Sequence, residues 1–157
     1  LCGLVLNKEK KTTNIIMSDP NKKRLDECGK YLKANFVSPN DKSIKENDFD
    51  LILESVGLEI TRHQAIKSIA PGGTILHIGL TQPSGTFDFK KLTIQEVTLV
   101  GTYCYTNKDF QKTLEILKEK QLGDLGWIEY RDLKKGSEAF QEIHNGTCVA
   151  PKIILIP

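Results

Sequence analysis

The sequence predicts an α/β fold, a doubly wound and mostly parallel sheet with helices on both faces. Short apolar runs of strand length alternate with amphipathic segments of helical period, which favours parallel strands joined by right-handed crossovers. These runs are nearly continuous in apolar residues, as expected for strands covered on both faces. With 157 residues the chain can bury a core of its own, and we expect residues 1–157 to form a single domain.

The first part of the chain predicts two strands and one helix. An apolar run at residues 14–18 stops at Asp19-Pro20, and residues 21–32 then carry apolar side chains at helical spacing. Phe36-Val37 is followed by the loop signal Ser38-Pro39-Asn40-Asp41, and a mostly apolar strand covers residues 49–57.

The remaining elements continue the same alternation. Residues 59–69 predict a helix, and Pro71-Gly72-Gly73 after it predicts a tight turn rather than a phosphate loop, because no helix follows directly. The other expected elements are strands at residues 74–79, 97–103 and 152–156 and amphipathic helices at residues 108–120 and 133–144.

Charge and composition exclude several classes of protein. The 22 basic and 20 acidic side chains are spread along the chain, which argues against a nucleic-acid-binding protein. No apolar run approaches the ~20 residues that a membrane-spanning helix needs, so we expect no membrane partner. The four cysteines lie far apart without a CxxC pair, which suits the reducing cytoplasm.

The sequence contains no recognisable catalytic constellation. His63, His77 and His144 have no serine, cysteine or glutamate partner at a known motif spacing, and packed or solvated histidines are the simpler interpretation. HExxH, GxSxG, Walker-type and metal-spaced motifs are all absent. We therefore expect neither catalytic residues nor a metal site in this chain.

Asp19 is the first candidate ligand-binding residue, because ligands of such sheets bind at the carboxyl ends of the strands. An acid at the end of the second strand of a nucleotide fold accepts hydrogen bonds from an adenosine ribose and repels a 2′-phosphate, which favours NAD over NADP. Asp19-Pro20 also fits an ordinary helix N-cap with proline at the first helical position, and the two roles are compatible. Arg24 could reach the same ribose, although a basic residue on a solvated helix face needs no function.

Two further strand ends could contact a ligand. Gly57 allows close approach to the backbone, or simply ends its strand. The stretch His77-Ile78-Gly79-Leu80 offers backbone groups that could hold a nicotinamide amide.

The dinucleotide fingerprint G-x-G-x-x-G is absent. Its acidic partner normally follows the glycine loop by about 20 residues, whereas Asp19 lies eighteen residues after Leu1. We therefore expect residues 1–7 to be the rest of the helix that the loop opens, and the chain to lack the first strand and the phosphate loop.

These segments together resemble the nucleotide-binding domain of the medium-chain dehydrogenase/reductase family, the zinc alcohol and polyol dehydrogenases. The resemblance covers nearly the whole chain in the right order, and this ordered set is more specific than any one motif. The matching stretches are IIMSD at 15–19, KRL at 23–25, FDLILESVG at 49–57, APGGTILHIGL at 70–80, LVGTY at 99–103 and GTCVAPKIIL at 146–155.

The resemblance implies a Rossmann-like fold, an NAD cofactor and a role for each matching position. Asp19 would bind the adenosine ribose, with Pro20 and Arg24 beside the adenine. Towards the nicotinamide, the resemblance implies a set of groove and backbone contacts made by Val56, Gly57, Ile78, Gly79, Leu80 and Tyr103. The strand at residues 97–103, which begins at Val97 and ends at Tyr103, would pair with its twin in a homo-oligomer and so protect an apolar edge.

The sequence also departs from the family pattern. The zinc ligands of the family's catalytic domain have no counterpart here, and there the zinc polarises the alcohol oxygen while the nicotinamide takes the hydride. We therefore expect a cofactor-binding fragment of an NAD-dependent alcohol or polyol dehydrogenase that is inactive alone.

Two other functions remain open at this point. An acid after the second strand and Pro-Gly-Gly before another also fit an S-adenosylmethionine-dependent methyltransferase. That class usually closes with an antiparallel hairpin strand, whereas here two amphipathic helices and a lone β run follow. A non-catalytic module that keeps the fold for assembly is the second alternative.

Overall fold

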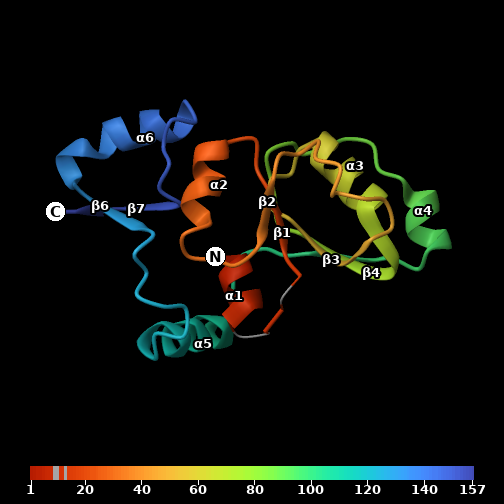
Figure 1. Cartoon of the computed structure of the whole chain (residues 1–157), viewed down its shortest axis with the longest axis horizontal. Helices are drawn as coiled ribbons and strands as arrows, with labels where there is room; N and C mark the ends of the chain where they lie inside the picture. The colour runs from red at the N-terminus through yellow and green to blue at the C-terminus, as the bar shows by residue number, and fades with distance from the viewer. Residues whose placement is uncertain (9–10, 13) are drawn as a thin grey trace. The chain divides into compact units, whose positions relative to one another are not determined.

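The computed structural model describes residues 1–8, 11–12 and 14–157 and confirms the α/β fold, with helices and strands alternating along the chain (Figure 1). Within these residues every strand pairing is parallel, in sheets of order β1-β2, β3-β4-β5 and β6-β7. The chain divides into two compact units: unit 1 comprises Leu1–Asp41 and Asn107–Pro157, and unit 2 comprises Lys42–Thr106. None of the helices in the described ranges has the length and apolarity to cross a membrane.

The first segment of unit 1 forms two helices and a pair of parallel strands. Its elements are α1 (Cys2–Lys8), β1 (Ile16–Ser18), α2 (Lys22–Cys28) and β2 (Asn35–Val37). The helix α2 is shorter than the expected range of 21–32, because Gly29 caps it and the next two N–H groups bond only three residues back. Leu4, Leu32 and Leu122 form the buried cluster of this unit.

The second segment of unit 1 contains a parallel strand pair, of which the sequence predicts only the strand at residues 152–156. Its elements are α5 (Asn107–Lys118), β6 (Ile128–Asp132), the 3-10 turn η1 (Leu133–Lys135), α6 (Gly136–His144) and β7 (Lys152–Ile156). β6 pairs with β7 along its whole length. It was not predicted because Glu129 and Arg131 interrupt its apolar residues, and both belong to an ion-pair network with Glu142 of α6.

Unit 2 is a three-stranded parallel sheet with β4 in the centre. Its elements are β3 (Phe49–Glu54), α3 (Glu59–Ser68), β4 (Ile69–His77), α4 (Phe89–Ile94) and β5 (Thr98–Gly101). Ile69 and Ile75 of β4 are fully buried, and Ala65 and Ile66 of α3 pack against them. The helix α3 therefore covers one face of this sheet, and the strand ends Glu54, His77 and Gly101 lie at one edge.

The expected tight turn at Pro71-Gly72-Gly73 lies inside β4, where the register shifts. Phe49 pairs with Ile69 and Leu51 with Thr74, so β3 advances two residues while β4 advances five. Gly72 has φ of +73° and donates its N–H to the Gln95 carbonyl oxygen at 2.8 Å. The turn prediction is thus replaced by a bulge that keeps the strand continuous.

Candidate functional site

Asp19 follows β1 directly and is held in place by the start of α2. Its Oδ1 accepts a hydrogen bond from the Asn21 N–H at 2.7 Å, and its Oδ2 lies 3.3 Å from Arg24 Nη1. The N-cap of α2 is Asn21, whose Oδ1 accepts from the Arg24 N–H at 3.2 Å. The expectation that Asp19 caps the helix with Pro20 at its first position is therefore wrong, since Pro20 precedes the cap.

This arrangement leaves Asp19 as a positioned acceptor. Its side chain is 27% exposed and that of Arg24 is 36% exposed, so solvent reaches both members of the ion pair. A carboxylate accepts up to about four hydrogen bonds, and among the described residues one N–H and one guanidinium donate to this one. The Asp19 carboxylate in turn offsets the positive charge of Arg24.

In unit 2, a buried carboxylate organises the turn that follows β3. Glu54 is 4% exposed, and its Oε1 accepts from the Val56 N–H at 3.0 Å, the Gly57 N–H at 2.7 Å and the Thr61 hydroxyl at 2.8 Å. These three bonds compensate for the burial of that oxygen. Sequence reasoning did not single out Glu54. The available signal was a charged residue ending an apolar strand, followed by glycine.

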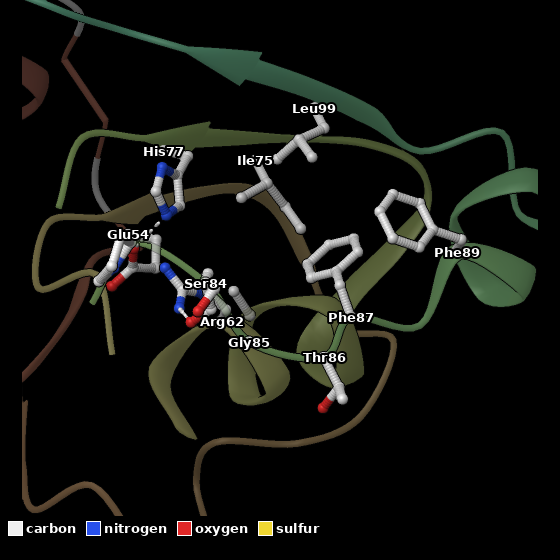
Figure 2. A pocket seen from close by; sticks show the side chains of 12 residues that line it. Glu54, Arg62, Ile75, His77, Ser84, Gly85, Thr86, Phe87, Phe89 and Leu99 are labelled. Carbon is white, nitrogen blue, oxygen red and sulfur yellow. Dashed lines mark hydrogen bonds and ion pairs between the residues drawn. The ribbon is translucent and has the colours of Figure 1, made fainter. Parts of the chain in front are cut away.

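The other oxygen of Glu54 faces the neighbouring strand. Glu54 Oε2 lies 3.2 Å from His77 Nε2, and the two residues are register partners on β3 and β4 (Figure 2). Both atoms are buried, and neither has an aligned hydrogen-bond partner among the described residues. Sequence reasoning interpreted His77 as a packed or solvated histidine without a partner, and the structure gives it this carboxylate.

Gly57 and Gly79 bring the ends of β3 and β4 into direct backbone contact. Gly57 has φ of +79°, and a Cβ built on it would lie 2.3 Å from the Gly79 carbonyl carbon. The Ile78 and Gly79 N–H groups both donate to the Glu54 carbonyl oxygen, at 2.8 and 3.1 Å. Four of the candidate residues, Val56, Gly57, Ile78 and Gly79, therefore lie together in unit 2.

Leu80 and Tyr103 lie near the same strand ends. The Leu80 side chain is 71% exposed, and that of Tyr103 is 80% exposed. Thr102, which precedes Tyr103, donates its N–H to the His77 carbonyl oxygen at 3.0 Å. The expected strand 97–103 is shorter in the structure, with β5 pairing only with β4 among the described residues. Asp19, Pro20 and Arg24 belong to unit 1, whereas the other six candidate residues belong to unit 2.

Three side chains of α3 hold the loop that follows β4. Arg62 donates to the carbonyl oxygens of Gly57, Gln82 and Ser84 at 3.2, 3.0 and 2.8 Å. Glu59 Oε1 accepts from the Thr86 N–H at 2.8 Å and from its hydroxyl, and these bonds lower the pKa of Glu59.

His63 completes this attachment. Its Nε2 lies 3.0 Å from the Thr86 carbonyl oxygen and 2.8 Å from the Thr86 hydroxyl oxygen. The segment 82–86 is thus fixed to the helix at several points.

Comparison with known proteins assigns the family. Residues 5–119, well over half of the chain, match the family model described as zinc-binding dehydrogenase. The chain belongs to this family. The resemblance to the nucleotide-binding domain of zinc-type alcohol and polyol dehydrogenases is thereby confirmed.

Individual relatives agree with this assignment. A probable D-xylulose reductase A of Aspergillus clavatus is 27% identical in an alignment of 142 residues, which covers 83% of this chain and 38% of that protein. The chain therefore spans well under half of the length of this relative.

Two solved structures share the fold. The 2R,3R-butanediol dehydrogenase of Bacillus subtilis has a TM-score of 0.81 at 20% identity, covering 98% of this chain and 47% of that one. Acetophenone reductase of Geotrichum candidum, solved in complex with NAD, has a TM-score of 0.68 at 16% identity, covering 96% and 53% of the two chains.

The zinc named in the family description has no fitting site in the part of the chain that the structure describes. Among residues 1–8, 11–12 and 14–157, no group of three or more histidine, cysteine, aspartate or glutamate side chains could hold a metal ion. Zinc proteins bind the metal with at least three such ligands.

Proposed function

We propose that this chain is the NAD-binding domain of an alcohol or polyol dehydrogenase and that it does not turn over an alcohol by itself. The observation that carries this proposal is the Asp19 carboxylate, positioned at the carboxyl end of β1 by Asn21 and Arg24 in a zinc-binding dehydrogenase chain. Support for the cofactor comes from the acetophenone reductase solved with NAD, and for the substrate class from the xylulose reductase relative.

Asp19 would accept hydrogen bonds from the two hydroxyls of the adenosine ribose, with Pro20 and Arg24 beside the adenine. A 2′-phosphate would place further negative charge against the same carboxylate, which disfavours NADP. Arg24 could attract that phosphate if it were free, but its charge is offset by Asp19 at 3.3 Å. Preference for NAD would therefore depend on the intact ion pair.

The ends of β3, β4 and β5 would contact the nicotinamide half of the cofactor. Val56 and Gly57 would line the groove, and Tyr103 would lie near the same end. The Ile78 and Gly79 N–H groups are already bonded to the Glu54 carbonyl oxygen, so the contacts would come from the carbonyl oxygens of Ile78 and Gly79 and from the Leu80 peptide. When bound, the nicotinamide ring supplies the hydride acceptor.

Isothermal titration of the chain with NAD, NADP and S-adenosylmethionine tests the proposal. We expect NAD to bind in preference to the other two, because Asp19 admits a free ribose and repels a phosphate. Asp19→Ser should lose about tenfold in NAD affinity and gain affinity for NADP, since Arg24 is then released. Asp26→Asn, which changes an exposed carboxylate of the same helix, is the matched control.

The outcomes separate the alternatives. Equal NAD affinity in Asp19→Ser and the unchanged chain would remove the role of Asp19. Preferential binding of S-adenosylmethionine would revive the methyltransferase interpretation, which the family match does not favour. Absence of binding by all three ligands would support a non-catalytic module, and turnover of an alcohol with zinc and NAD would contradict the proposed inactivity.

The scattered free cysteines support a reducing compartment, for which we propose the cytoplasm.

A further inference from the structure

Glu54 bonds to the ends of two neighbouring strands at once, through its side chain and through its main chain. Its Oε1 accepts the N–H groups of Val56 and Gly57 at 3.0 and 2.7 Å, in the turn after β3. Its main-chain carbonyl oxygen accepts the N–H groups of Ile78 and Gly79 at 2.8 and 3.1 Å, directly after β4. One residue therefore takes up four N–H groups of the proposed nicotinamide end.

The Glu54 carboxylate itself is closed off from a ligand. Its side chain is 3% exposed, and its Oε1 also accepts from the Thr61 hydroxyl at 2.8 Å. Its Oε2 is closed to solvent and faces His77 Nε2 at 3.2 Å (Figure 2). Glu54 would therefore act on a ligand through the backbone groups that it holds, as a positioning residue.

The backbone groups that stay free at these strand ends are mostly acceptors. The carbonyl oxygens of Val56 and Gly57 already accept hydrogen bonds. Among the described residues, no group donates to the carbonyl oxygens of Ile78 and Gly79, and none accepts from the Leu80 N–H. Residues 78–80 thus present free carbonyl oxygens and a single free N–H.

A primary amide matches this set of free groups, whereas a carboxylate does not. The NH₂ of a carboxamide donates to carbonyl oxygens, and its own oxygen accepts from an N–H. An ionised carboxylate has acceptors only, so it would face the carbonyl oxygens with no proton to share. Polar groups that are desolvated without a partner weaken binding.

We propose that Glu54 makes this edge of the sheet specific for the carboxamide of the nicotinamide, against the corresponding carboxylate. Its side chain does so by keeping the N–H groups of Val56 and Gly57 from the ligand. The Ile78 and Gly79 carbonyl oxygens then accept from the carboxamide NH₂, and the Leu80 N–H donates to its oxygen. This inference rests on the proposed NAD-binding function and adds a specificity to it.

The test compares NAD with nicotinic acid adenine dinucleotide, in which a carboxylate replaces the carboxamide, by isothermal titration of the full chain. We expect NAD to bind about tenfold more tightly than the carboxylate analogue. Glu54→Met removes the acceptor at nearly constant size and should reduce this ratio to about twofold or less. The N–H groups of Val56 and Gly57 then lack an acceptor and are free to pair with the ligand carboxylate.

Two further variants separate this role from charge and from loss of stability. Glu54→Gln loses the charge but keeps an oxygen for the turn, with its NH₂ towards His77, and should retain the tenfold ratio. Glu59→Met is the same substitution at a carboxylate of α3 that bonds to Thr86. It leaves the bonds of Glu54 in place and should also retain the ratio.

Hydrogen exchange in the unmodified chain tests the assignment without any variant. The Val56 and Gly57 amides should be protected in the free chain, because Glu54 accepts from both. The Leu80 amide should gain protection with NAD but not with ADP-ribose, which lacks the nicotinamide ring. This measurement decides the matter if Glu54→Met does not fold.

Each result has a defined meaning. A ratio that falls in Glu54→Met but persists in Glu54→Gln and Glu59→Met supports the proposal. An unchanged ratio in Glu54→Met, an equal fall in either other variant, equal binding of the two dinucleotides to the unmodified chain, or equal protection of Leu80 by ADP-ribose would each overturn it. In those cases NAD still binds and the proposed function stands, whereas absence of NAD binding would overturn both.

Discussion

Replacing Gly57 with alanine should destabilise unit 2 far more than the same replacement at Gly72. Both glycines adopt the left-handed backbone conformation, with φ of +79° and +73°. Alanine costs about 1–2 kcal/mol in this region, and reduced freedom of the unfolded chain offsets part of that cost equally at both positions. The two sites differ in the room available for an added Cβ. At Gly57 the Cβ would lie 2.3 Å from the Gly79 carbonyl carbon, whereas at Gly72 it meets nothing within 4 Å.

The expected magnitudes follow from this difference. Overpacking against side chains costs about 1–3 kcal/mol, and the atoms met at Gly57 belong to the backbone, which cannot rotate away. We therefore expect a loss of about 1 kcal/mol for Gly72→Ala and of about 4 kcal/mol for Gly57→Ala. Gly72→Ala serves as the control for left-handed strain alone.

Native-state hydrogen exchange at the Ile78 amide is the suitable measurement. This N–H bonds to the Glu54 carbonyl oxygen at 2.8 Å and exchanges when the ends of β3 and β4 separate. Equal losses in the two variants would show that Gly57 and Gly79 are not in contact and would refute the reasoning.

Three further predictions concern the edge strand, one carboxylate and one ion-pair network. Val100→Lys in β5 should shift the sedimentation mass towards monomer if this edge pairs between subunits, and an unchanged mass would exclude such pairing. The pKa of Glu59 is lowered by its bonds from Thr86, so the attachment of the loop persists above the ordinary glutamate pKa and weakens as the pH falls through the lowered value. The protection factor of the Thr86 amide against hydrogen exchange should fall in that acid range, and Glu59→Gln should abolish this dependence on pH. The pKa of Glu142 is lowered by Arg131, so Arg131→Ala should return it towards its ordinary value in a carbon-detected NMR titration; an unchanged titration would contradict the ion pair.

Most strands could be predicted from the sequence because they are short apolar runs bounded by turn residues. The strand β6 was missed because two charged residues, Glu129 and Arg131, alternate with its apolar residues and break the apolar run. The helix α4 was missed because it lies in a polar stretch and buries no residue. Gly72 was interpreted as a turn residue, since sequence cannot distinguish a turn from a bulge in a continuous strand.

The candidate site was only partly accessible from sequence. Glycines at strand ends pointed to Gly57 and Gly79, because such positions commonly serve close approach of the backbone. The contact of Gly57 with Gly79, and of Glu54 with His77, depends on the register of β3 and β4, which no local pattern contains. The sequence suggested Asp19 as the N-cap of α2, whereas the structure has Asn21 there. Both residue types fit a cap, and only the geometry of α2 decides between them.

The division into units has a consequence for biosynthesis. Unit 2 is one uninterrupted stretch, whereas unit 1 is assembled from both ends of the chain. The cluster of unit 1 joins Leu4 and Leu32 to Leu122, and β6 needs β7 near the end of the chain. During vectorial synthesis unit 2 can therefore complete its contacts before unit 1 does. The first segment of unit 1 is made before unit 2, but it can complete its contacts only after the second segment of unit 1 has been made. Until residues 107–157 are made, Leu4 and Leu32 lack Leu122, the third member of their buried cluster.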